Sequence, residues 1–177
     1  MEENSMGKLR LYLREYHAVE GYFGIKRTTG LDGAVFRAED ILSQSHGKPS
    51  EPQRRVLRGT TDLLERYVET GREFASEHRQ ELVEIYEELS SLFKDYQGKR
   101  DKRFSTTHGY NTVRLNLLKQ ERVIFPSLIE GIIISLRVLK EKGINGKELN
   151  DRALLLKNKY WGIYNRRKAE YQARKSD

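Results

Sequence analysis

Cysteine is absent from this chain of 177 residues, and proline and methionine are scarce, with three and two copies. The absence of cysteine excludes disulfides, thiolate zinc sites and a cysteine nucleophile. Glycine-rich phosphate loops and an HExxH motif are also missing, and the four histidines lie in separate segments. We therefore expect no enzymatic activity, no metal and no cofactor.

A long apolar run is missing too. The most apolar stretch, residues 123–139, is shorter than the roughly 20 residues that cross a bilayer, and Glu130 and Arg137 interrupt it. Residues 1–8 contain two acidic side chains and no apolar run, so they do not resemble a signal peptide. The sequence therefore predicts no membrane span and a location in the cytoplasm or within a virion.

Sustained alternation of apolar and polar residues is absent, whereas apolar residues recur every three or four positions along most of the chain. This pattern predicts an all-α protein of five to seven helices, arranged as an elongated helical bundle. Residues 123–139 are apolar on more than one helical face and predict a central buried helix. We expect a single domain with four parts: a helical hairpin (1–45), a linker (46–51), a helical core (52–156) and a basic, aromatic helix end (157–177).

Residues 51–96 carry the pattern of one long helix. Ser50 and Gln53 have the spacing of a capping box, and apolar or small residues then recur by threes and fours over residues 57–96, with one four-residue stutter. An unbroken helix here would have roughly 45 residues, and any break is expected at residues 59–62. We expect this heptad seam (residues 57–96) to be buried by the central helix or by a second copy, so a homo-oligomer is predicted.

The remaining boundaries come from local signals. We expect a first helix over residues 5–23, a loop over residues 97–112 and a helix over residues 111–124. Pro126 either kinks that helix or begins a new one. Gly143, followed by Ile144, predicts a glycine cap at the end of the central helix, and a last helix over residues 146–174 follows.

Charge is distributed unevenly along the chain. Residues 51–96 carry 7 basic and 11 acidic side chains, a balance of −4, whereas residues 97–177 carry 19 and 8, a balance of +11. Such asymmetry often marks a surface that binds a polyanion. The alternative is that the acidic segment lies against the basic one inside the fold.

Basic and aromatic side chains share one face of the last predicted helix. Lys and Arg neutralise phosphates while aromatic rings stack on bases, so we expect binding of DNA or RNA with low sequence specificity. Gly162 and the aromatic residues argue against a helix that reads bases. Alternatively, Trp161 and Tyr164 belong to the core and the lysines form its rim. The predicted contacts are the stripe Lys157, Trp161, Tyr164, Lys168, Tyr171 and Lys175, widened by Arg166, Arg167 and Arg174, with Lys99, Arg100, Lys102 and Arg103 from the predicted loop.

Three other interpretations stay open. A helical adaptor or scaffold would act through protein contacts on the heptad seam. Arg103 and His108, like Arg72 and His78, fit the loose Arg-to-His spacing of helical ribonucleases of the HEPN class, a remote alternative. Finally, a basic all-helical chain with an aromatic, Arg-rich last helix resembles in architecture, without a shared motif, the coat proteins of filamentous archaeal viruses. That resemblance implies a self-assembling, DNA-packaging role.

Overall fold

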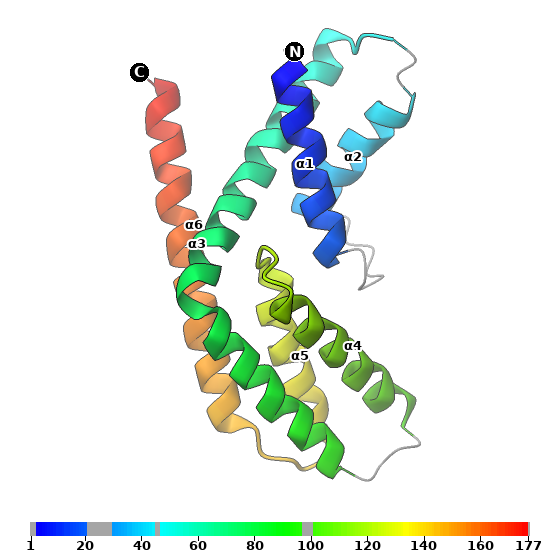
Figure 1. Cartoon of the computed structure of the whole chain (residues 1–177), viewed down its shortest axis with the longest axis vertical. Helices are drawn as coiled ribbons and strands as arrows, with labels where there is room; N and C mark the ends of the chain where they lie inside the picture. The colour runs from blue at the N-terminus through cyan, green and yellow to red at the C-terminus, as the bar shows by residue number, and fades with distance from the viewer. Residues whose placement is uncertain (1–2, 21–29, 45–46, 97–100, 177) are drawn as a thin grey trace. The chain divides into compact units, whose positions relative to one another are not determined.

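The structure is a computed structural model that describes residues 3–20, 30–44, 47–96 and 101–176. These residues form helices joined by turns and short connections, with no strand among them (Figure 1). The prediction of an all-α helical bundle is therefore confirmed. In chain order the helices are α1 (Glu3–Glu20), α2 (Leu31–Gln44), α3 (Glu51–Asp95), α4 (Lys102–Lys119), α5 (Pro126–Glu141) and α6 (Lys147–Ser176).

The contacts divide the chain into two compact units, an amino-terminal unit (Met1–Glu69) and a carboxy-terminal unit (Thr70–Asp177). The boundary lies within α3, which contributes its first half to one unit and its second half to the other. The predicted linker corresponds in part to the non-helical residues 47–50 between α2 and α3, but the units do not divide there.

The amino-terminal unit is built from α1, α2 and the first half of α3. Its core consists of fully or almost fully buried apolar side chains from all three helices. Thr60 on α3 donates a hydrogen bond to the carbonyl of Ala34 on α2 at 3.3 Å, and Lys8 on α1 pairs with Glu65 on α3 at 2.6 Å. The core side chains are Leu9, Tyr12, Leu13, Tyr16 and Val19 of α1, Ala34, Val35 and Ala38 of α2, and Leu57, Leu64 and Val68 of α3.

The long helix α3 forms as the sequence predicts. The capping box is present, since Ser50 N donates to Gln53 Oε1 at 2.8 Å and Gln53 N donates to Ser50 Oγ at 3.5 Å. The helix is 45 residues long and does not break at residues 59–62. Thr61 Oγ1 donates to the carbonyl of Leu57 one turn earlier, at 2.8 Å, so its hydroxyl is satisfied within the helix.

The heptad seam is largely buried within one chain, so the prediction of burial is confirmed. Six of its members have 0% relative exposure, and Tyr67, His78, Leu92 and Tyr96 are half-buried. Burial within the chain removes the need for a second copy to cover the seam; the predicted homo-oligomer stays a prediction. The fully buried members are Leu57, Leu64, Phe74, Leu82, Ile85 and Leu89.

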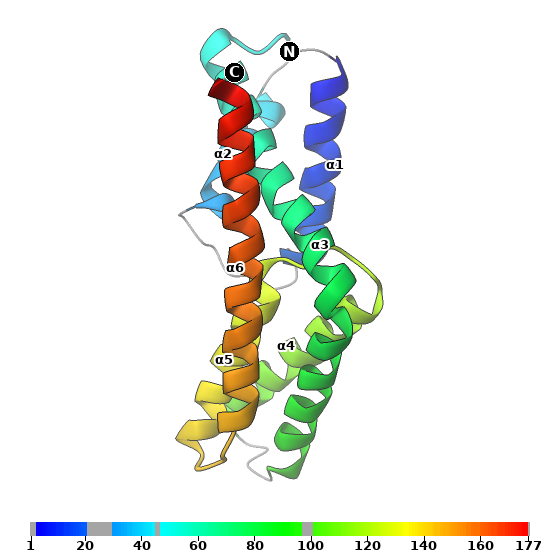
Figure 2. The ribbon, with the colours of Figure 1, turned by 90° about the vertical axis from the view of Figure 1, so that its left-hand side faces the viewer.

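Helix α5 is the central helix of the carboxy-terminal unit. It packs directly against α4 and α6 (Figures 1 and 2) and accepts a hydrogen bond from α3, where the Tyr86 hydroxyl donates to the carbonyl of Leu128. Among its large apolar side chains Ile134 is the exposed one, with 38% of its surface exposed. The helix begins at Pro126, with Phe125 as its N-cap, so Pro126 starts a new helix and residues 123–125 precede it.

Small and polar residues make the contact between α4 and α5. Asn111 Oδ1 accepts two hydrogen bonds, one from Ser135 Oγ at 2.8 Å and one from Arg114 Nη1 at 3.3 Å. A Cβ on Gly131 would come within 2.6 Å of Arg114 Cζ and 2.8 Å of the Tyr86 hydroxyl. Glycine is therefore required for this close packing of the buried guanidinium.

The predicted loop over residues 97–112 is wrong from residue 102 onward, because α4 already begins at Lys102. Asp101 is the N-cap, and its carboxylate accepts from Arg103 N at 3.0 Å and Phe104 N at 3.3 Å. Phe104 then packs on Phe93 of α3, with ring centroids 4.6 Å apart. The tertiary contact favours helix where the sequence has glycine and several β-branched residues.

The end of α4 also differs from the prediction. It lies at Lys119 and not at residue 124, because Glu121 adopts a left-handed φ of 54°. Arg79 on α3 donates to the carbonyl of Leu118 at 2.9 Å and to that of Arg122, so a side chain from another helix satisfies this terminus.

The turn between α5 and α6 is the glycine cap that the sequence predicts. Gly143 has a φ of 76°, Gly143 N donates to the Lys140 carbonyl at 3.0 Å and Ile144 N donates to the Leu139 carbonyl at 3.1 Å. These two bonds define a Schellman motif. Asn145 then caps α6, where Lys147 N donates to its side chain at 3.1 Å.

Candidate nucleic-acid interface

Helix α6 has two parts with different surroundings. Its buried row ends at Tyr164, and from residue 165 to 176 every residue is exposed except Arg167 and Tyr171, which are half-buried. The second part continues past the last core position to the carboxy end (Figure 2). The buried row is Leu149, Ala153, Leu156, Tyr160 and Tyr164.

The first three residues of the predicted stripe pack within the carboxy-terminal unit. Lys157 forms an ion pair with Glu130 of α5 at 2.6 Å. Tyr164 is buried, and the half-buried Trp161 packs edge-on against it, with ring centroids 5.2 Å apart. These positions match the alternative in which the aromatic residues are core and the lysine is its rim.

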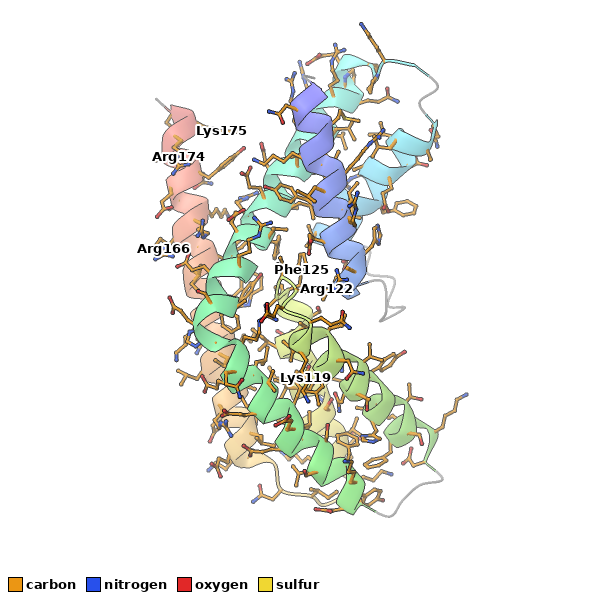
Figure 3. The ribbon with its side chains drawn as sticks, in the orientation of Figure 1. Lys119, Arg122, Phe125, Arg166, Arg174 and Lys175 are labelled. Atoms are coloured by element: carbon orange, nitrogen blue, oxygen red, sulfur yellow. The ribbon has the colours of Figure 1, made fainter. Side chains whose placement is uncertain are left out.

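The last three residues of the stripe lie on the exposed part. Lys168 and Lys175 are exposed, Tyr171 is half-buried, and the Lys175 ammonium lies 4.7 Å from the centroid of the Tyr171 ring. Arg174, which widens the stripe, is exposed beside Lys175 near the carboxy end of the helix (Figure 3). The structure thus shortens the predicted interface to the end of α6.

Arg166 and Arg167 both bind Glu73 of α3. Arg167 donates to Glu73 Oε2 from Nε at 3.0 Å and from Nη2 at 2.6 Å, while Arg166 Nη2 bonds the other oxygen. The hydrogen bond from Arg166, with a smaller contribution from Arg167, lowers the pKa of the Glu73 carboxyl. Two guanidinium groups on one carboxylate leave one positive charge in excess.

The sequence did not reveal this cluster. Glu73 belongs to the acidic segment 51–96, while Arg167 is 94 positions away along the chain. Other acidic residues of α3 behave in the same way: Glu87 pairs with Lys119 at 3.2 Å and Glu88 with Arg152 at 2.8 Å. These ion pairs support in part the alternative that the acidic segment lies against the basic one.

The predicted contacts at the start of α4 do not lie beside the predicted stripe on α6. Lys99 and Arg100 lie outside the described residues, Lys102 is exposed, and Arg103 pairs with Glu141 at 2.6 Å. Lys102 and Arg103 are in the first turn of α4, and Figure 1 shows this turn and the carboxy end of α6 at opposite ends of the carboxy-terminal unit.

Three of the four residues in the Arg-to-His pairs contact other groups. Arg103 is held by Glu141, whereas His108 stacks on Phe93, with ring centroids 5.6 Å apart and planes at 15°. The His78 ring packs against the Phe74 ring, with centroids 5.0 Å apart, and lies close to the carboxylates of Glu77 and Glu81 on the same helix. Among the described residues no group of three or more His, Asp or Glu could hold a metal ion. Within the same residues, no helix combines the length and apolar character of a membrane span.

Comparison with protein-family models, with curated proteins and with solved structures found no match to this chain. Its function is therefore inferred from its own charges and geometry.

Proposed function

We propose that the protein is a non-enzymatic nucleic-acid-binding protein of low sequence specificity, and that it contacts DNA or RNA through the basic end of α6 (residues 165–176). One observation carries the proposal: this exposed segment has five basic side chains and a single acidic one, Glu170. Such a segment suits a polyanion, since each Lys or Arg that neutralises a phosphate releases a counterion. The basic residues are Arg166, Arg167, Lys168, Arg174 and Lys175.

The proposed contacts differ in strength. Lys168, Arg174 and Lys175 are exposed and would contact phosphates directly. Arg166 and Arg167 share Glu73, so together they contribute about one net positive charge. Tyr171 offers a ring next to Lys175 for stacking with an unpaired base.

Salt dependence of binding tests this proposal. If ~4 phosphates are neutralised on a duplex, log K falls with log salt at a slope of about −3 to −4. In a tail variant, Lys168→Ala/Arg174→Ala/Lys175→Ala, the slope should flatten by up to ~3. All three side chains are exposed, so the variant should keep its helical circular dichroism spectrum.

A matched control removes three exposed arginines from the amino-terminal unit, Arg10→Ala/Arg14→Ala/Arg37→Ala. This control should retain the slope of the wild type. The end of α6 is not the interface if the tail variant binds nucleic acid as tightly as the wild type. The same conclusion follows if the control loses as much affinity as the tail variant.

Truncation gives a second test. A chain ending at Arg167 keeps the whole buried row of α6 and its bonds to Glu73, so it should stay folded and lose binding. The same titration on random duplex, single-stranded DNA and RNA distinguishes two roles: duplex preference favours packaging or a coat, and single-strand preference favours RNA or replication.

The adaptor hypothesis depends on the heptad seam, and that surface is largely buried within the chain. No exposed seam is left among the described residues for a partner to bind. The absence of any salt-dependent polyanion binding would nevertheless favour a protein-binding role.

A further inference from the structure

A pocket lies at the turn between α5 and α6, inside the carboxy-terminal unit and far along α6 from its basic end. Its volume is about 480 Å³, within the range of ~300–1,000 Å³ found for small-ligand sites. Apolar side chains line part of it, namely Ile133 and Leu136 from α5 and Ile144 from the turn. The Schellman motif and the Asn145 cap hold this turn in one conformation.

Three basic side chains line the same pocket, Arg137 and Lys140 from α5 and Lys147 from the first turn of α6. No Asp or Glu lines it. The spacing of Arg137 and Lys140 places both on one face of α5, and the turn brings Lys147 across from them. Three cations therefore surround a partly apolar space.

These cations differ from five other basic residues of the unit. Arg103, Lys119, Lys142, Arg152 and Lys157 each form an ion pair with a carboxylate. Within the described part of the chain, by contrast, Arg137, Lys140 and Lys147 form no ion pair. Three neighbouring like charges repel one another and raise the local potential, which an anion would relieve.

We propose that this turn pocket binds a phosphate monoester carried on an apolar or planar group, the chemistry of a mononucleotide. Arg137, Lys140 and Lys147 contact the phosphate, and Ile133, Leu136 and Ile144 contact the organic group. Arginine offers paired N–H donors to phosphate oxygens, and lysine adds point charge.

The test is calorimetric titration of the full chain with AMP, adenosine and inorganic phosphate, at low salt. AMP should bind more tightly than either fragment, because only AMP uses both the cations and the apolar side chains. In a pocket variant, Arg137→Ala/Lys140→Ala/Lys147→Ala, the Kd for AMP should rise by ~10-fold or more. Amide NMR shifts should locate the ligand at residues 133–150.

The tail variant is the matched control, since it also removes three exposed cations but leaves the pocket intact. It should bind AMP as the wild type does, and the pocket variant should in turn bind duplex DNA as the wild type does. The two proposals therefore fail independently. The turn pocket is rejected if AMP does not bind, if adenosine or phosphate alone binds equally well, or if the pocket variant retains full affinity.

Discussion

Two N–H groups of Arg167 donate to one carboxylate oxygen of Glu73, joining the end of α6 to α3 across 94 positions of sequence. Arg166 bonds the second oxygen, so both oxygens of the carboxylate accept hydrogen bonds. The cluster links α6 to α3 within the carboxy-terminal unit, and in the proposed function it occupies charges that a polyanion would use. Its two roles lead to separate predictions.

We expect Glu73→Gln to lower the free energy of unfolding at neutral pH by about 0.5–1 kcal/mol, a modest value because the pair is partly exposed to solvent. The Arg166 hydrogen bond lowers the pKa of Glu73 below its ordinary 4.5, so the native state favours the ionised form. This contribution is complete above pH 4.5 and is lost as pH falls through the lowered pKa. Urea unfolding of both proteins should show a difference at pH 7 that shrinks in acid; an unchanged difference would exclude the ion pair as its source.

We expect the same substitution to strengthen nucleic-acid binding. Glu73→Gln removes the negative charge beside Arg166 and Arg167, so one further phosphate can be neutralised and the salt slope should steepen by ~1. Glu87→Gln, which frees Lys119 at a different place, is the control and should leave the slope unchanged. A weaker or unaltered affinity in Glu73→Gln would show that these arginines do not contact the polyanion.

We expect Gly71→Ala to destabilise the protein strongly. A Cβ at residue 71 would come within 2.7 Å of Val123 Cγ1 and closer still to the carbonyl oxygen of Ile124, so the backbone connection before α5 would have to move. Overpacking of this kind costs ~1–3 kcal/mol. The control is Gly162→Ala in α6, where nothing lies within 4 Å and alanine should add about 0.5–1 kcal/mol through helix propensity. Equal stabilities by urea unfolding would contradict the close approach.

We expect opposite effects at two left-handed positions of the carboxy-terminal unit, Glu121 and Gly143. Glu121 has a φ of 54° and an exposed side chain, so Glu121→Gly should relieve strain and raise stability by ~0.5 kcal/mol. Gly143 has a φ of 76° with open space around it, so Gly143→Ala should cost ~1 kcal/mol through backbone strain alone. Thermal unfolding of the two variants measures both changes in stability. A lower stability of Glu121→Gly would mean that the carboxylate has a structural role.

Local signals in the sequence were sufficient for the fold class and for several helix ends. The capping box at Ser50 and the glycine cap at Gly143 each depend on residues within about five positions, so the sequence determined them by itself. At Pro126 the sequence left a kink and a new helix open, and the structure has the new helix. The apolar character of residues 123–139 likewise predicted the central helix. Its first three residues precede the helix but are still buried.

Only the tertiary structure decided which charges are neutralised and which aromatic rings are buried. Nothing local distinguishes Tyr164, a core residue, from Tyr171, which is half-buried near the end of the same helix. The start of α4 at Asp101 was missed because Phe104 gains its stability from Phe93 on another helix. The physical reason is common to these cases: periodicity and caps report interactions within one or two turns, whereas the Glu73–Arg167 bond exists only after α6 has packed along α3.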